Sequence, residues 1–208
     1  AYTARKACQR ATHVIAVSNF VRDFLVNNWS QPPDKTGVVY HGMESFLNFD
    51  QFERPKVLKH GDCDNFVFTA GSIRPARGLE DAIAAMSTLK SQGLPHRLVI
   101  AGQVEPGMGF YKRKLDKLAS KLGVSDRVIW SGFLNAEEMS WCFRNAVFFI
   151  MTSRVEACPN IALEAMGNGC LIISTQNPPM PEFFKDAALY YQSGSADDLG
   201  KKISVGMG

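Results

Sequence analysis

The chain contains the apolar run Val147-Phe148-Phe149-Ile150-Met151 and, after four more residues, the stretch Glu156-Ala157-Cys158-Pro159-Asn160-Ile161-Ala162-Leu163-Glu164. The apolar run has the length of a buried β-strand, and residues 161–166 have a helix-like pattern. This order places Glu156 on a loop that leaves the sheet and Glu164 within the first turns of the following helix. Ligands of open α/β sheets bind at this edge. The two carboxylates therefore predict a site for a ligand rich in hydroxyl groups.

Outward from this stretch, short apolar runs alternate with segments of helical periodicity, which is typical of βα units in a parallel sheet. Leu79, Ile83 and Met86 recur at helical spacing and indicate a packing face. We therefore expect the α/β class, with a Rossmann-like parallel sheet between two layers of helices. The expected strands are 14–17, 37–40, 66–70, 97–101, 128–130, 147–151 and 171–174, and the expected helices are 19–28, 79–92, 111–122, 136–144, 161–168 and 196–205.

The composition favours a globular protein and excludes several classes of function. Of the 208 residues 46% are hydrophobic, and the net charge of +3 is too small to indicate a nucleic-acid partner. The five cysteines are odd in number and lack CxxC spacing, which argues against a zinc site and a disulfide framework. No apolar run approaches the roughly 20 residues of a membrane span. We expect a cytoplasmic protein without a metal or cofactor.

The chain begins without Met inside a helix-like segment and ends soon after a helix has begun. We interpret it as a fragment or a trimmed sequence. Residues 1–36 resemble the tail end of a different unit, and residues 37–208 form the body of one domain that is incomplete at its C-terminal end. Residues 44–65 show little periodicity, which predicts a surface loop or an interdomain connection.

The first candidate phosphate site is Gly71-Ser72-Ile73-Arg74-Pro75-Ala76-Arg77-Gly78, between an expected strand and an expected helix. Glycines let a ligand approach the backbone closely, and a helix N-terminus offers unpaired N–H groups to an anion. Arg74 and Arg77 add positive charge, and an arginine can bind phosphate through two parallel hydrogen bonds. An ordinary βα turn with exposed arginines explains this stretch as well.

The second candidate is the start of the helix that contains Glu164. Asn is a preferred helix cap and Pro is tolerated in the first turn, so the backbone N–H groups of Cys158, Asn160 and Ile161 are expected to be free there. With the helix dipole they suit a pyrophosphate or sugar hydroxyls. Glu164 has a simpler alternative role, because a carboxylate near a helix N-terminus also complements the dipole.

Glu156 must be exposed or hydrogen-bonded, because a charged carboxylate between two apolar elements is costly to bury. It could accept hydrogen bonds from two neighbouring sugar hydroxyls, or it could form a surface salt bridge with Arg154. Among weaker candidates, Gly102 permits close backbone approach or makes an ordinary turn. Phe133 and Leu134 could line an apolar slot for a base, or pack in the core.

These elements, in the order 71–78, Gly102, 132–134 and the two glutamates of the E-x7-E arrangement, resemble a known family. They are similar to the nucleotide-sugar-binding domain of retaining GT-B glycosyltransferases, often called family 4 or glycosyl transferases group 1. The match spans roughly residues 12–200. It implies that the chain is the C-terminal half of a GT-B fold and that the acceptor-binding N-terminal domain is almost wholly absent.

The resemblance implies roles for the matching positions. Glu164 corresponds to the glutamate that binds the ribose hydroxyls, and Glu156 to the one that faces the donor sugar and orients it. Arg77 stands where the family usually has a lysine on the donor pyrophosphate, so it and Glu156 are the candidate catalytic residues. Backbone groups at 133–134 correspond to those that meet the base, and the amides at 158–161 to those that cradle sugar and phosphate.

Two departures from the family pattern concern the donor. Ser72 occupies a position where many members have an arginine, and Arg74 could replace that charge. Cys158 and Pro159 replace a glycine-rich segment and remove one backbone donor, which leaves the sugar preference open.

The implied reaction transfers a sugar from a UDP- or GDP-type nucleotide diphosphate sugar, with retention of configuration and without a required metal. The implied acceptor is a sugar, a lipid or another molecule bound by the missing domain, and the full-length protein could associate with a membrane surface. One alternative is a nucleotide-sugar-binding module without transferase activity. A glycosidase-type pair of carboxylates fits the helix position of Glu164 less well.

Overall fold

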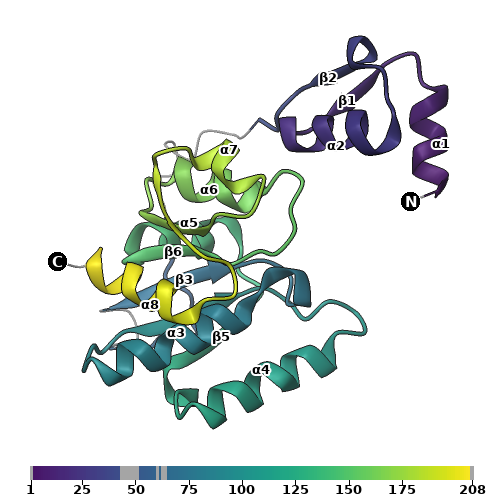
Figure 1. Ribbon diagram of the computed structural model, residues 1–208. Coiled ribbons are helices and arrows are strands. Elements are labelled where there is room, and N and C mark those ends of the chain that lie inside the picture. Colours follow the sequence, from purple (N-terminus) through teal and green to yellow (C-terminus); the bar gives the residue numbers. More distant parts are fainter. Residues whose placement is uncertain (1, 43–51, 60, 62–64, 207–208) are drawn as a thin grey trace.

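The computed structural model describes residues 2–42, 52–59, 61 and 65–206. A six-stranded sheet occupies the centre, with the order β5-β4-β3-β6-β7-β8 and every neighbouring pair parallel (Figure 1). Its strands are β3 (Phe66–Ala70), β4 (Arg97–Ala101), β5 (Val128–Gly132), β6 (Phe148–Met151), β7 (Ile172–Thr175) and β8 (Ala188–Tyr191).

Helices cover both faces of this sheet, as the expected three-layer α/β/α fold requires. On one face α3 (Leu79–Ser91), α4 (Gly109–Lys121) and α8 (Ala196–Val205) share a buried apolar cluster with the strands. On the other face α5 (Ala136–Asn145), α6 (Asn160–Gly167) and α7 (Met180–Phe184) share a second cluster. The expected fold class is confirmed.

Successive side chains of a strand point to opposite faces of the sheet, so each strand contributes to both clusters. In β3, Val67 packs into the first cluster while Phe66 and Phe68 pack into the second. The rings of Phe68 and Phe149 lie 6.0 Å apart and both contact Phe143 of α5. Because all five residues of β3 and all four of β6 are buried, the apolar runs that mark these strands in the sequence lie at the centre of the sheet.

The direction in which successive strands are added to the sheet changes at the neighbouring strands β3 and β6. Strands β4 and β5 are added on one side of β3, whereas β6, β7 and β8 extend the sheet on the other. In sheets of this kind the crevice at the carboxyl ends of the strands at the reversal is the usual ligand site. The loops after β3, β4, β5 and β6, which carry the predicted site residues, lie at this edge.

The N-terminal segment, residues 2–42, is built separately. It contains α1 (Tyr2–Arg10), β1 (Val14–Ala16), α2 (Asn19–Trp29) and β2 (Thr36–Val38). Among the residues that the structure describes, β1 and β2 pair with each other and with no other strand. Figure 1 shows this segment away from the large sheet, on the side of α7. The division at residues 36 and 37 stays a prediction, and β1 and β2 pair across it.

Residues 44–65 were expected to form a loop or a connection, and most of them lie outside the described residues. Those that are described include two packing contacts. Leu58 is buried in the second cluster, and the Arg144 guanidinium lies 4.0 Å from the centre of the Phe52 ring. At least part of this stretch therefore packs on the domain.

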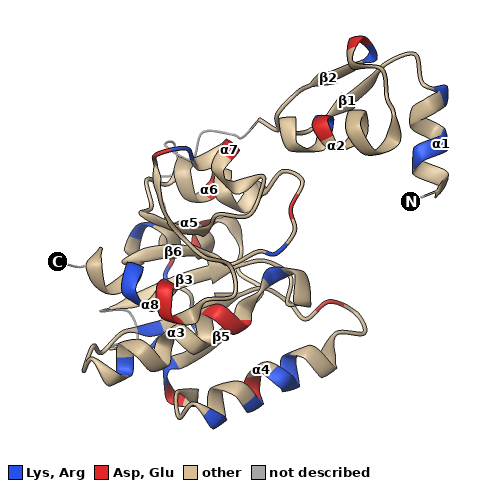
Figure 2. Ribbon diagram, viewed as in Figure 1, with Lys and Arg blue, Asp and Glu red and all other residues tan. Residues whose placement is uncertain are grey.

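Lys and Arg residues are frequent along α4 (Figure 2). Lys112 bonds Asp116 on the same helix, and its ammonium lies 4.0 Å from the centre of the Trp130 ring. Lys114 lies 3.5 Å from Glu80 of α3.

No helix in the described part of the chain is long and apolar enough to cross a membrane.

Candidate functional site

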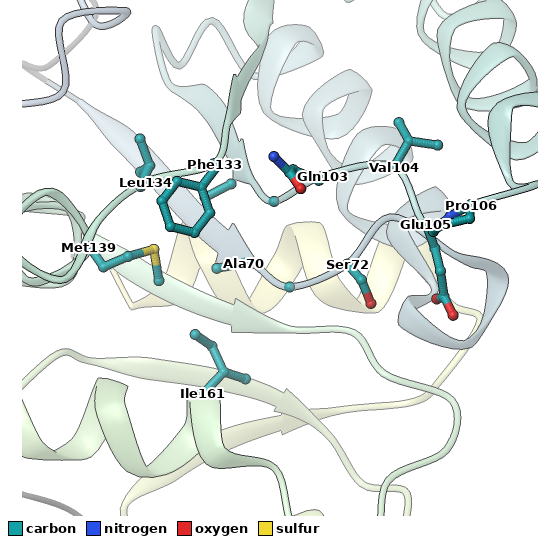
Figure 3. A pocket seen from close by; sticks show the side chains of 13 residues that line it. Ala70, Ser72, Gln103, Val104, Glu105, Pro106, Phe133, Leu134, Met139 and Ile161 are labelled. Atoms are coloured by element: carbon teal, nitrogen blue, oxygen red, sulfur yellow. The ribbon is translucent and has the colours of Figure 1, made fainter.

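A cavity of about 420 Å³ lies at the carboxyl edge of the sheet. Six predicted site residues line it, and they come from four different loops or helices: Gly71, Ser72, Gly102, Phe133, Leu134 and Ile161. Figure 3 shows Phe133, Leu134 and Met139 toward one end and Ser72 and Glu105 toward the other. The structure therefore brings together residues that lie up to 90 positions apart in the sequence.

The floor of the cavity is largely backbone, because two strand ends meet there without side chains. Gly71 donates its N–H to Ala101 O at 3.0 Å, and Gly102 donates to Gly132 O at 2.7 Å. A Cβ on Gly102 would lie 2.0 Å from Gly71 O, and its φ of 132° is one that L side chains rarely adopt. Only glycine fits there, so backbone and not a side chain borders the cavity at this point.

Arg77 and Glu156 form an ion pair at the edge of the same site. Arg77 Nη1 lies 2.5 Å from Glu156 Oε1 and 3.3 Å from Ser153 Oγ, and both charged side chains are less than one fifth exposed. The guanidinium also lies over the bare Cα of Gly71. Glu156 thus pairs with Arg77, and the salt bridge with Arg154 that the sequence left open is not formed.

Arg154 instead ties the Glu156 loop to α3. Its guanidinium bonds both carboxylate oxygens of buried Asp81, at 2.6 and 2.7 Å. The hydroxyl of Tyr191 and the N–H of Gly194 also donate to that carboxylate, at 3.0 and 2.9 Å. Hydrogen bonding to Asp81 raises the pKa of Arg154 despite its partial burial. The loop therefore rests on a rigid polar network.

The loops after β3 and β6 are also joined directly. Arg154 donates its N–H to Ala76 O at 2.7 Å, and Thr152 Oγ1 donates to Arg77 O at 2.6 Å. Gly78 permits this approach, because a Cβ there would lie 2.4 Å from Thr152 O. Arg77 and Glu156 are held against each other by backbone as well as by charge.

Arg74 forms a separate ion pair with Glu105. Its Nε lies 3.5 Å from Glu105 Oε2, and both side chains are 40% exposed. Glu105 lines the cavity, whereas Arg74 does not. The expectation that Arg74 replaces the charge missing at Ser72 stays untested, and Arg74 would have to leave Glu105 to do so.

Glu164 lines a neighbouring cavity of about 210 Å³ between α5 and α6, which shares Leu134 and Met139 with the larger one. Burial raises the pKa of its carboxyl above the usual range. We find no hydrogen bond to this carboxylate within the part of the chain that the structure describes. Such a half-buried acceptor is suited to paired hydroxyl donors.

The start of α6 differs in detail from the expectation. Pro159 is the residue at the cap and Asn160 is the first helical residue, without a side-chain cap. The Asn160 side chain bonds the His41 ring instead, with Oδ1 2.7 Å from Nδ1. Burial raises the pKa of the nearby Cys158 thiol, and hydrogen bonding from the His41 backbone N–H acts against this. In the described residues no backbone acceptor takes the N–H of Asn160 or Ile161.

Several residues at this site carried no signal in the sequence. Gln103, Glu105 and Met139 line the cavity, and each lies on a loop or helix whose path depends on the tertiary fold. His41 lies outside the predicted site residues, yet its ring bonds the side chain of Asn160 at the start of α6. No group of three metal-ligating side chains occurs among the described residues.

An open parallel sheet with an apolar cavity, an arginine–glutamate pair and a free helix start at its switch point places the chain among the α/β proteins whose ligand crevice lies at this edge. The family model for glycosyl transferases group 1 matches residues 50–205. The chain belongs to this family.

Relatives with assigned activities are distant and longer. Alpha-monoglucosyldiacylglycerol synthase of Streptococcus pneumoniae is 25% identical over 204 residues, which cover 91% of this chain and 44% of that protein. D-inositol 3-phosphate glycosyltransferase of Streptomyces coelicolor is 27% identical over 183 residues, covering 79% of this chain and 40% of that protein. The chain thus spans less than half the length of these relatives.

Solved structures confirm the fold. HepE of Anabaena, solved in complex with UDP-glucose, superposes with a TM-score of 0.84 at 20% identity, over 99% of this chain and 57% of HepE. The C-terminal domain of a glycosyl transferase group 1 family protein from Francisella tularensis superposes with a TM-score of 0.64 at 20% identity, over 79% of this chain and 87% of that domain.

Proposed function

We propose that this chain is the donor-binding half of a retaining glycosyltransferase that uses a nucleotide diphosphate sugar. The observation that carries the proposal is the pairing of Arg77 with Glu156 at the edge of an apolar cavity whose neighbour contains Glu164. A nucleotide diphosphate sugar has a flat base, a ribose, a doubly charged pyrophosphate and a hydroxyl-rich sugar. The site offers a matching group for each of these parts.

In this proposal the base lies in the cavity between Phe133 and the glycine floor. Leu134 and Met139 border both cavities, so a base in the larger one places its ribose toward Glu164 in the smaller one. The ribose hydroxyls donate to that carboxylate, which burial has left poorly solvated. Burial disfavours the charged form, and two hydroxyl donors would restore the hydrogen bonds that water supplied.

The pyrophosphate lies between Arg77 and the start of α6. Arg77 supplies full charge, and the N–H groups of Asn160 and Ile161 add the positive end of the helix dipole. Glu156 is then freed from Arg77 to accept hydroxyls of the donor sugar. Binding thus exchanges one ion pair for two charge-assisted contacts, and the buried arginine is not left unpaired.

The proposed reaction breaks the bond between the anomeric carbon and the distal phosphate oxygen, and the nucleoside diphosphate leaves with the electron pair. The acceptor hydroxyl attacks from the same face, its proton passes to the departing phosphate oxygen, and the configuration is retained. Arg77 and the α6 amides stabilise the charge that develops on the pyrophosphate. We expect Arg77 and these amides to stabilise the leaving diphosphate without a bound metal. Glu156 orients the sugar and is not the nucleophile.

Binding of the acceptor, and therefore complete turnover, is assigned to residues outside this chain. We propose a cytoplasmic enzyme that can bind a membrane surface when its acceptor is a lipid, as the name of the pneumococcal relative would allow. The alternative, a binding module without transfer, predicts the same donor affinity in the full-length protein but no product.

Isothermal titration with UDP-sugars and GDP-sugars tests the proposal. Arg77→Ala and Glu164→Ala are each expected to weaken donor binding at least tenfold, equivalent to about 1.4 kcal/mol. Arg113→Ala on α4 and Asp186→Ala beyond α7 remove the same charges from exposed positions and are expected to bind like wild type. Unchanged affinity in both site variants would contradict the assignment.

A further inference from the structure

Glu182 of α7 holds the N-terminal segment against the domain. Its Oε1 accepts the N–H of Asn19 at 2.6 Å, and its Oε2 accepts the N–H of Phe20 at 3.0 Å. These are the first two N–H groups of α2, and Oε1 also accepts the Asn19 side chain at 3.0 Å. A carboxylate at a helix N-terminus satisfies both orphan donors and the dipole at once.

The same carboxylate also bonds Tyr40, two residues after the end of β2. The hydroxyl of Tyr40 donates to Glu182 Oε1 at 2.5 Å, and the Tyr40 ring packs edge-on against Phe183, with centroids 5.6 Å apart. Burial alone would raise the pKa of Glu182, but the hydrogen bonds from Tyr40, Asn19 and Phe20 outweigh it and lower the pKa. The Glu182 side chain thus bonds the N-terminal segment at two separate places, the start of α2 and Tyr40.

Ser18 and His41, the residues next to Asn19 and Tyr40, each form a hydrogen bond with the candidate site. Ser18, which is fully buried and precedes Asn19, donates its hydroxyl to Ala157 O at 2.7 Å. His41, which follows Tyr40, bonds the Asn160 side chain at 2.7 Å. Ala157 immediately follows Glu156, and Asn160 begins the helix of Glu164. The Glu182 contacts at Asn19 and Tyr40 are therefore each one residue away from a contact on the site loop.

We propose that Glu182 is a positioning residue that, through Ser18 and His41, holds residues 156–160 in the conformation that binds the donor. The site loop is then supported from two sides. Arg154 and Asp81 fix it to α3, and the N-terminal segment fixes it from the other side. Without Glu182 the first turn of α2 loses the acceptor of its N–H groups. We expect the Ser18 hydroxyl and the His41 ring then to lose their hydrogen bonds to Ala157 and Asn160. This role rests on the proposed function only for its link to donor binding.

Alkylation of Cys158 by iodoacetamide reports the conformation of this loop directly. The thiol is half-buried, and hydrogen bonding from the His41 backbone lowers its pKa against the effect of burial, so loss of this neighbour is expected to expose it. Cys142 is fully buried in the core and reports global opening in the same sample. Peptide mass spectrometry gives both rates from one protein preparation.

Glu182→Ala is expected to speed alkylation of Cys158 severalfold and to leave the rate at Cys142 unchanged. Glu182→Gln keeps one oxygen acceptor and should give an intermediate rate, and Asp186→Ala should behave like wild type. Adding Ser18→Ala and His41→Ala to Glu182→Ala should produce little further increase, because both act through the same contact. An unchanged Cys158 rate, or equal acceleration at Cys158 and Cys142, would overturn the proposal.

Donor affinity supplies a second measurement. If the wild-type chain binds UDP or GDP, Glu182→Ala is expected to weaken that binding several-fold, with Glu182→Gln in between. If wild type binds neither nucleotide, the proposed function fails, while the alkylation rates still decide whether Glu182 positions the loop. Wild-type affinity in Glu182→Ala together with faster alkylation would overturn the link to donor binding.

Discussion

Removal of the buried carboxylate of Asp81 tests the network that supports the site. Asp81 is 5% exposed and accepts two hydrogen bonds from Arg154, one from Tyr191 and one from the Gly194 N–H. In Asp81→Ala these donors lose their acceptor and Arg154 keeps an unpaired charge. Breaking a buried ion pair from one side costs about 3–5 kcal/mol.

The lower end of this range applies, because the Arg154 side chain is 31% exposed and water can solvate part of its charge. A loss of about 3 kcal/mol corresponds to a decrease in Tm of about 6–12 °C for a chain of this length. Asp116→Ala is the matched control. It breaks the pair with Lys112 on the surface of α4, where Asp116 is 49% exposed, and exposed pairs of this spacing contribute about 0.3–0.5 kcal/mol.

Thermal and urea denaturation of both variants, and of Arg154→Ala and the double variant, provide the measurement. The double variant should cost clearly less than the sum of the two single losses, because the two residues share one interaction. Donor affinity should also fall in Asp81→Ala, since Arg154 lies two residues before Glu156. A loss of stability for Asp81→Ala within about 0.5 kcal/mol of that for Asp116→Ala would refute the reasoning.

Three further predictions concern single positions. Gly102→Ala should destabilise the fold more than Gly123→Ala, for which a loss of about 1 kcal/mol is expected, and it should abolish nucleotide binding, because its Cβ would overlap Gly71 O. Urea denaturation measures the loss of stability and titration measures the nucleotide affinity. Equal losses of stability in the two variants would refute the close approach of Gly102 to Gly71. Burial raises the pKa of Glu164, so the folded state binds the proton more tightly and loses stability as the pH rises from about 4.3 to the raised value. Glu164→Gln should therefore be more stable than wild type at pH 7 and equally stable well below pH 4.3, and a difference that does not depend on pH would contradict this account. Burial also raises the pKa of Cys170 to about 12, so its alkylation at pH 8 should be far slower in the native than in the urea-unfolded protein, and similar rates would argue against burial.

The sequence predicts the centre of the fold better than its edges. β3 and β6 are continuous apolar runs because both faces of each are covered by helices, and such runs are readily recognised. α7 has five residues and β8 has four, so neither is long enough to show a period, and both were missed. α4 begins two residues before the expected start, at Gly109.

The candidate site shows the same limit. Gly71 and Gly102, which follow a strand directly, and Glu156, on the loop after β6, could be placed because the carboxyl ends of parallel strands share one edge. The pairing of Glu156 with Arg77, and not with Arg154, depends on how two loops cross, which no spacing encodes. Glu182 acts across more than 140 positions of sequence on Asn19 and Tyr40, and its helix carries no periodic signal.

A thermal-shift titration of the chain with nucleotide diphosphate sugars tests the central claim most directly. A ligand that binds only the folded state at 100 times its Kd stabilises it by about 2.7 kcal/mol. At least one UDP- or GDP-sugar is expected to raise the Tm in a concentration-dependent manner, and Arg77→Ala should remove the shift at the same concentrations. No shift with any of these sugars, or an undiminished shift in Arg77→Ala, would contradict the account.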